Sequence, residues 1–156
     1  FYSGFMFFYN LERNGKMPGS AQEIRYINRD ENTHLWLFRN IIKELQNENP
    51  ELFTNEIKSE LREMMEYGVS QEILWGHYVI GDNIQGINKK LIEDYIKYLG
   101  NKRLREINLE PLYSTEYDKN PASWVDSLSN ANSVKTDFFE ARSTAYAKAA
   151  TLVDDL

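Results

Sequence analysis

The spacing of apolar residues along the chain predicts four helices and no β-strands. The first helix covers residues 1–14, where phenylalanine and leucine side chains recur every three or four positions and therefore share one helical face. The segment 15–19 contains two glycines and a proline, which interrupt the pattern. A second helix is expected from this break onward.

The second helix is predicted over residues 20–47 and ends before Pro50. Ser20 and Glu23 have the spacing of a capping box, in which the serine caps the helix and the glutamate reaches back to its amide. At 1.5 Å per residue the helix is about 40 Å long, a length typical of large helical bundles.

Two further helices are predicted over residues 55–80 and 88–107. Gly100 lies inside the later one and weakens the helical pattern there. The apolar residues expected to form the buried stripe of the earlier one are Ile57, Leu61, Met64, Trp75 and Val79.

The last part of the chain has a different composition. Serine and asparagine crowd the sequence after Trp124, and apolar residues become sparse, so we expect a weakly ordered tail. The pattern therefore divides the chain into a helical unit, residues 1–126, and a flexible tail, residues 127–156. Because the chain opens within an apolar helical pattern, we interpret it as the C-terminal piece of a longer protein.

Charge and composition narrow the classes of function. The 18 Lys and Arg residues against 24 Asp and Glu residues give a net charge of −6, which argues against a nucleic-acid-binding protein. The sequence contains no cysteine, so disulfides, thiolate metal sites and a cysteine nucleophile are excluded. No apolar run is long enough for a membrane span.

The second predicted helix carries two ionisable residues in the middle of its apolar stripe. Glu31 and His34 occupy stripe positions, one turn apart. A buried carboxylate requires a compensating partner, and a divalent metal is one such partner. Glu-x-x-His is also the half-site spacing of dinuclear carboxylate proteins built on helical bundles. The remaining stripe positions are Ile24, Ile27, Phe38, Ile41 and Leu45.

A plainer interpretation stays open beside the metal site. Glu31 and His34 can be a hydrogen-bonded polar pair, or their face can be partly exposed. His77 has no Glu-x-x-His partner and is expected to have a structural or surface role. Glu72 is expected to pair with a neighbouring helix rather than to bind metal.

Several segments together resemble the small, radical-generating subunit of class I ribonucleotide reductase. The strongest is residues 25–35 (RYINRDENTHL), with its Arg-Asp-Glu-x-x-His core, and residues 16–24 (KMPGSAQEI) lead into it. Residues 1–5 (FYSGF), 84–89 (IQGINK) and 135–140 (KTDFFE) also fit, so the resemblance covers nearly the whole chain. It implies an all-α fold, namely the C-terminal helices of a ferritin-like bundle.

The resemblance also implies roles for individual residues. Glu31 and His34 match metal ligands, and Asp30 matches an aspartate that hydrogen-bonds a metal-bound histidine and belongs to a radical-transfer chain. Tyr146 matches the tail tyrosine that relays the radical between subunits. The residues that match the apolar pocket beside the metals are Phe1, Phe5 and Ile27.

The function implied is that of a ribonucleoside-diphosphate reductase small subunit. Its dinuclear Fe/Fe or Mn/Fe centre activates oxygen and generates the radical used to reduce ribonucleotides to deoxyribonucleotides. The implied partners are a second small subunit and the large catalytic subunit, reached through the tail, and the implied location is the cytoplasm. The resemblance requires six metal ligands, of which this chain supplies two, and we expect the remainder before Phe1.

Two alternatives remain at the level of sequence. One is a ferritin-like dinuclear carboxylate protein of another kind, either a ligand-binding oxidase or an iron-storage protein, which needs no radical-transfer tail. The other is a helical protein without metal that acts through contacts alone. Asp30 next to Glu31, and the tail from Phe138 to Tyr146, favour the reductase subunit over the first alternative. A further Glu-x-x-His and a carboxylate upstream of Phe1 would separate all three.

Overall fold

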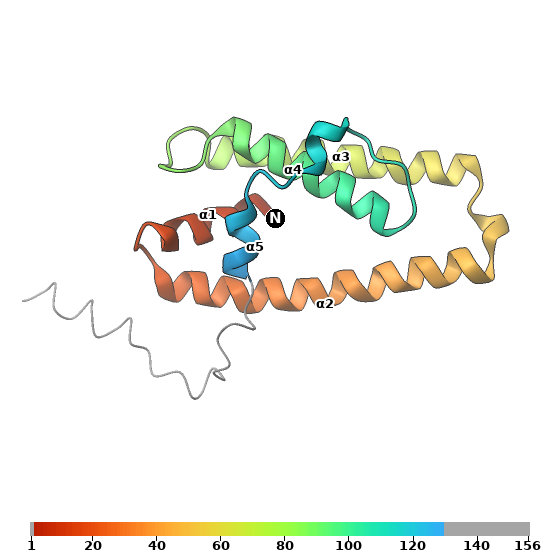
Figure 1. Cartoon of the computed structure of the whole chain (residues 1–156), viewed down its shortest axis with the longest axis horizontal. Helices are drawn as coiled ribbons and strands as arrows, with labels where there is room; N and C mark the ends of the chain where they lie inside the picture. Colours follow the sequence, from red (N-terminus) through yellow and green to blue (C-terminus); the bar gives the residue numbers. More distant parts are fainter. Residues whose placement is uncertain (1, 130–156) are drawn as a thin grey trace, which may run out of the picture.

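The computed structural model describes residues 2–129 (Figure 1). All regular secondary structure in this part of the chain is helical. The long helices confirm the all-α prediction. The α-helices are α1 (Tyr2–Arg13), α2 (Pro18–Glu48), α3 (Asn55–Val79), α4 (Lys89–Glu106) and α5 (Ser123–Ser129), and the 3₁₀ helices are η1 (Pro50–Leu52) and η2 (Thr115–Asp118).

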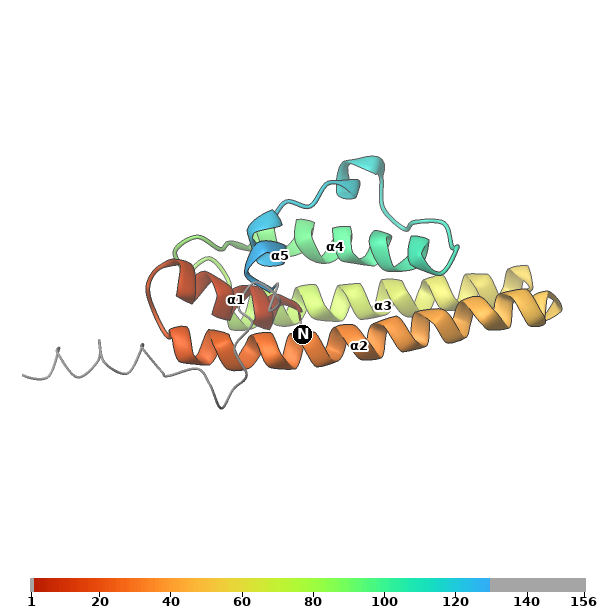
Figure 2. The same ribbon diagram turned by 60° about the horizontal axis from the view of Figure 1, so that its bottom comes forward.

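The long helices alternate in direction. The chain runs along α1, turns back along α2, reverses at η1 into α3 and reverses again into α4 (Figure 1). Helices α1 and α5 lie against the first half of α2, and the second half of α2 extends beyond them in both views (Figure 2). Among the described residues, α4 packs most extensively on α3, and α2 packs most extensively on α1.

The hydrophobic core lies where α1, α3, α4 and α5 meet. Met6 and Tyr9 of α1 and Ile92 of α4 are fully buried. Ala122 and Val125 close the core from the side of α5. The other buried apolar residues of this cluster are Val69, Ile80, Ile87, Tyr95, Ile96 and Leu99.

The start of the second helix differs from the sequence prediction. The helix begins at Pro18, so Ser20 lies within its first turn and is not the cap, and the predicted capping box is wrong. The residue before the helix is Met17, in the left-handed conformation at φ 48°. Proline suits the first helical turn because its fixed φ is already helical and its missing N–H needs no partner there.

The other helix ends agree closely with the prediction. Thr54 caps α3 by accepting a hydrogen bond from the N–H of Ile57, and Asn88 caps α4 by accepting one from Leu91. Gly100 does not interrupt α4. A Cβ atom on Gly100 would lie 2.9 Å from Val69 Cγ2, so glycine at this position allows α3 and α4 to approach closely.

The predicted buried stripe of α3 is wrong. Met64 is 69% exposed and Val79 is 54% exposed, whereas the residues buried on this helix are Val69 and Gly76. Helices α1 and α4 cover the side of α3 that carries these smaller residues. The large apolar side chains on the opposite side are therefore left at the surface of this chain.

Helix α5 extends three residues into the segment expected to be a tail. Its end is held in place, because Arg25 donates a hydrogen bond from Nε to the carbonyl of Leu128 at 2.8 Å. The guanidinium of Arg13 also lies 4.3 Å from the centre of the Trp124 ring. Residues 130–156 lie outside the described residues, so the proposed division into a helical unit and a tail stays a prediction. None of the described helices is long and apolar enough to span a membrane.

Two glycines of α3 offer a direct test of this packing. A Cβ on Gly76 would lie 2.8 Å from Ile92 Cγ2 and 3.2 Å from Ser3 Cβ, whereas a Cβ on Gly68 would meet nothing within 4 Å. We expect Gly76→Ala to lower the free energy of unfolding by about 1–3 kcal/mol through overpacking. Gly68→Ala should raise it by roughly 0.5–1 kcal/mol because alanine is the better helix former. Urea denaturation of the two variants measures both, and equal effects would contradict the close contact at Gly76.

Candidate functional site

Glu31 and His34 lie side by side on α2. The His34 Nδ1 and Glu31 Oε2 atoms are 3.4 Å apart, so the two side chains converge on one face of the helix, as their spacing predicts. The Glu31 side chain is 57% exposed and the His34 side chain is 62% exposed. Within residues 2–129 the pair is therefore at the surface, and its burial in an assembled metal site stays a prediction.

The apolar stripe around this pair is exposed as well. Ile27 is 49% exposed on one side of the pair and Phe38 is 61% exposed on the other. Ile41 and Leu45 continue the stripe and are also exposed. The stripe predicted from the sequence thus exists as one face of α2; Ile24 at its start packs against the core, whereas from Ile27 onward no element within residues 2–129 buries it. A contiguous exposed apolar face of this kind marks a surface that packs against another protein segment or a partner.

Asp30 points to solvent in this structure. Its carboxylate accepts a hydrogen bond from Arg29 Nε at 3.1 Å, and its side chain is 62% exposed. The Arg29 guanidinium in turn lies 5.4 Å from the centre of the Tyr26 ring. The predicted contact of Asp30 with an imidazole is not formed among the described residues.

The residues expected to form the apolar pocket are separated here. Phe5 is half-buried and packs edge-to-face on Tyr2, with ring centres 6.1 Å apart, beside the core. Ile27 lies on the exposed face of α2. Phe1 and Tyr146 lie outside the described residues.

Glu31 and His34 fit part of a metal site. A carboxylate and an imidazole that converge on one face are suitable ligands for iron or manganese. Within residues 2–129, however, no group of three or more potential ligands comes together. The pair therefore provides two donors of a larger ligand set, and a complete dinuclear centre requires carboxylates and imidazoles from elsewhere.

One buried polar contact near this face was not anticipated from the sequence. Asn28, one turn before Glu31, donates a hydrogen bond from Nδ2 to the hydroxyl of Tyr9 at 3.1 Å. Burial raises the pKa of the Tyr9 hydroxyl, so this group stays protonated at neutral pH. The available signal was an asparagine immediately after the stripe residue Ile27, which by itself does not distinguish burial from exposure.

The expectations for Glu72 and His77 are confirmed. Glu72 of α3 accepts hydrogen bonds from the backbone N–H of Ser3 at 3.0 Å and from its hydroxyl, and so joins α3 to α1. His77 Nε2 lies 3.0 Å from the carbonyl oxygen of Lys89, which links the end of α3 to the start of α4. Both residues have structural contacts between helices.

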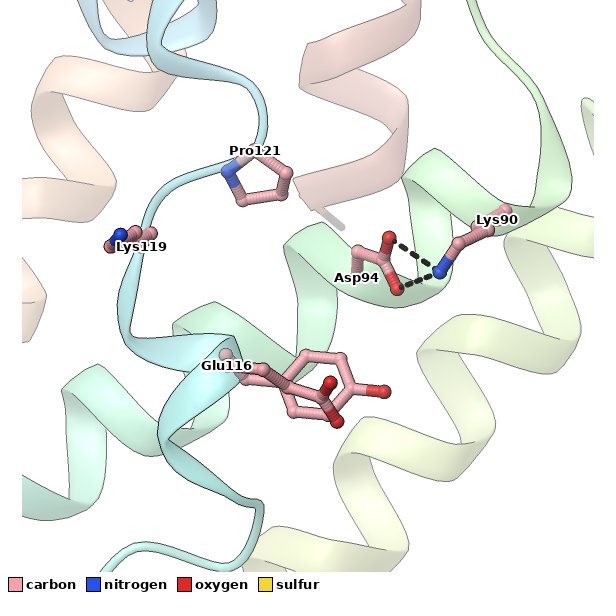
Figure 3. Close-up of a pocket in the computed structure, with 6 residues that line it drawn as sticks. Lys90, Asp94, Glu116, Lys119 and Pro121 are labelled. Atoms are coloured by element: carbon pink, nitrogen blue, oxygen red, sulfur yellow. Dashed lines mark hydrogen bonds and ion pairs between the residues drawn. The ribbon is translucent and has the colours of Figure 1, made fainter.

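The structure also contains a small polar hollow, of roughly 150 Å³, away from the pair on α2 (Figure 3). It is lined by α4, η2 and the loop that follows η2. Lys90 and Asp94, on its edge, are already paired with each other at 2.9 Å. The hollow therefore offers no convergent set of free donors comparable with Glu31 and His34.

Comparison with known proteins places this geometry in a family. The family model described as "Ribonucleotide reductase, small chain" matches residues 1–121. The ribonucleoside-diphosphate reductase subunit beta of Treponema pallidum is 62% identical over 157 residues, which cover all of this chain and 45% of that protein. The subunit beta of Halalkalibacterium halodurans is 47% identical over 148 residues, covering 95% of this chain and 43% of that protein.

A solved structure agrees with the sequence relatives. The ribonucleotide reductase R2 subunit from Clostridium botulinum superimposes with a TM-score of 0.78 at 56% identity, over 82% of this chain and 40% of that one. The predicted ferritin-like helical fold is thereby confirmed. The chain spans somewhat less than half the length of these relatives. On this evidence, the chain belongs to the small-chain family of ribonucleotide reductases.

Proposed function

We propose that this chain is part of the small subunit of a cytoplasmic ribonucleoside-diphosphate reductase. The observation that carries the proposal is the pairing of Glu31 with His34 on one face of α2, inside a segment that matches the family model. When bound, a dinuclear Fe/Fe or Mn/Fe centre supplies oxygen activation and the one-electron oxidation that ribonucleotide reduction requires. The Treponema pallidum relative, which matches the whole chain, supports the same assignment.

The residues of this chain have distinct parts in the proposed function. Glu31 and His34 contribute two ligands, and the carboxylate offsets part of the metal charge. Asp30, next to Glu31, accepts a hydrogen bond from an imidazole ligand and so orients it. Ile27 and Phe5 supply apolar surface that excludes water once the uncovered face of α2 is packed.

The missing ligands are the central requirement of the proposal. A dinuclear site of this family needs six ligands, and two come from α2. We infer that the remainder come from the part of the protein that lies before residue 1, and that the same part covers the apolar stripe of α2. Packing of that stripe would transfer Glu31 and His34 from solvent to the protein interior, where the metal charge compensates their burial.

The proposed partners are a second small subunit and the large catalytic subunit. In this proposal the tail, residues 127–156, docks on the large subunit, and Tyr146 relays the radical between the subunits. These assignments rest on the resemblance of the segment that includes residues 135–140, because the segment lies outside the described residues.

The ligand assignment can be tested in the whole protein at the length of its relatives. We expect Glu31→Gln and His34→Ala to lower the metal content measured by elemental analysis after reconstitution with iron or manganese. The matched control is Glu44→Gln, which alters an exposed glutamate further along the same helix. Full metal content in the Glu31 and His34 variants would show that these residues are not metal ligands.

The chain of 156 residues alone is expected to bind metal weakly. Two donors that are more than half exposed do not replace a full set of carboxylates and imidazoles. Metal analysis of the purified chain after dialysis against iron or manganese should find far less than one ion per chain. Stoichiometric, tightly held metal would show that this chain, or a pair of its copies, completes the site.

Tyr146 can be tested by removing its hydroxyl group. In the whole protein, Tyr146→Phe keeps the aromatic ring for docking but removes the O–H that a proton-coupled relay requires. We expect binding to the large subunit and metal content to stay unchanged, while ribonucleotide reduction falls to background. Normal turnover by the Phe variant would show that Tyr146 is not the relay.

A further inference from the structure

Helix α2 is held to the rest of the described chain mainly through α1. Its other contacts are smaller and involve α5, η1 and the end of α4, where Gln46 Nε2 donates a hydrogen bond to the carbonyl of Ile107 at 2.7 Å. Helix α1 is itself anchored, because Ser3 hydrogen-bonds Glu72 of α3 and Asn10 Nδ2 donates to the carbonyl of Gln85 at 2.8 Å. The contact between α1 and α2 therefore determines how the first half of α2, which carries Asn28 and Glu31, is oriented relative to the core.

One polar pair lies inside that contact. Asn28 is 7% exposed and Tyr9 is fully buried, and their 3.1 Å hydrogen bond joins α2 to α1. Asn28 and Ala21 are the two buried residues on the 31-residue helix α2. Apolar contacts tolerate sliding and rotation, whereas a hydrogen bond has a preferred direction. This pair is thus the buried directional contact of the interface, and an ion pair between Arg25 of α2 and Glu12 of α1 lies nearer the start of α2.

The position of Asn28 relates it directly to the two metal ligands. Successive residues of an α-helix are about 100° apart, so Glu31 lies roughly 60° around the helix from Asn28, and His34 lies about 120° around it in the same direction. A rotation of α2 by about 20° would move side-chain atoms at its surface by roughly 2 Å. Metal–ligand distances tolerate deviations of only about 0.2 Å.

We propose that Asn28, held by Tyr9, is a positioning residue that sets the rotation of α2 and thereby aims Glu31 and His34 at the metal centre. The inference rests on the proposed function of these two ligands. Asn28 itself is directed at α1 and is not a ligand. The pair is neutral, because a buried tyrosine with a raised pKa stays protonated, so it adds no charge beside the site.

Two single variants and their combination test the role. Tyr9→Phe removes the hydroxyl acceptor, and Asn28→Ala removes the amide donor. In the whole protein at the length of its relatives, we expect each variant to weaken Mn²⁺ binding about tenfold. This is the lower end of the loss of metal affinity that follows when a residue that orients metal ligands is changed. The free Mn²⁺ signal in an EPR titration measures the affinity. Because both variants break one interaction, the double variant should bind no more weakly than the weaker single variant.

The matched control is a second buried asparagine that is not in contact with α2. Asn101 of α4 is fully buried, accepts hydrogen bonds from the N–H groups of Leu112 and Tyr113, and donates to the Tyr113 carbonyl at 3.1 Å. Asn101→Ala should lower the unfolding temperature at least as much as Tyr9→Phe. It should leave Mn²⁺ affinity at the wild-type value, because it does not alter the contact between α1 and α2.

The outcomes separate this inference from the proposed function. Wild-type Mn²⁺ affinity in both Tyr9→Phe and Asn28→Ala, or an equal loss in Asn101→Ala, overturns the positioning role. Undiminished affinity in Glu31→Gln and His34→Ala overturns the ligand assignment itself. If Asn28→Ala does not fold, Tyr9→Phe still decides the question, because it deletes one oxygen atom and keeps the ring in the core.

Discussion

The packing of α1 between the other helices is the constraint on which the described structure depends. Its inner residues Met6 and Tyr9 are fully buried, and α1 contacts each of the other four α-helices. Its buried polar groups each reach a different element, namely Ser3 to α3, Asn10 to the loop before α4, and Tyr9 to α2. Because Ser3, Tyr9 and Asn10 are themselves buried, breaking one of these bonds would leave a buried polar group unsatisfied. Helix α1 thus fixes both the core and the direction of the helix that bears the candidate ligands.

Local chemistry explains which features of the fold could be predicted from the sequence. The ends of α3 and α4 follow from Thr54 and Asn88, whose side chains cap the helices whatever packs around them. The capping-box pattern at Ser20 predicts too late a start for α2, because Pro18, which resembles part of the preceding break, opens the helix. The buried side of α3 was missed because the prediction followed large apolar residues, whereas close approach of α1 requires the absence of a side chain at Gly76.

The candidate site also combines features that depend on one helix with features that depend on packing between segments. Spacing within one helix places Glu31 and His34 on a common face, and the structure confirms this with atoms 3.4 Å apart. Whether that face is buried depends on which other segments pack on it, and the spacing within α2 contains no such information. The Asn28–Tyr9 bond was missed for a related reason, since it joins residues of two helices whose relative orientation is known only after folding.

The attachment of α5 has a consequence for the proposed docking of the segment that follows it. Arg25 holds the Leu128 carbonyl and Arg13 covers Trp124, so the point at which the chain leaves α5 is fixed on the body formed by α1 and α2. A binding segment tethered at a fixed point has an effective concentration near its target that depends on the length of the tether and on where it starts. Under the proposed docking of the tail on the large subunit, these two arginines set the point from which the tail reaches its partner, and loosening them would change the apparent affinity without altering any residue that touches the partner.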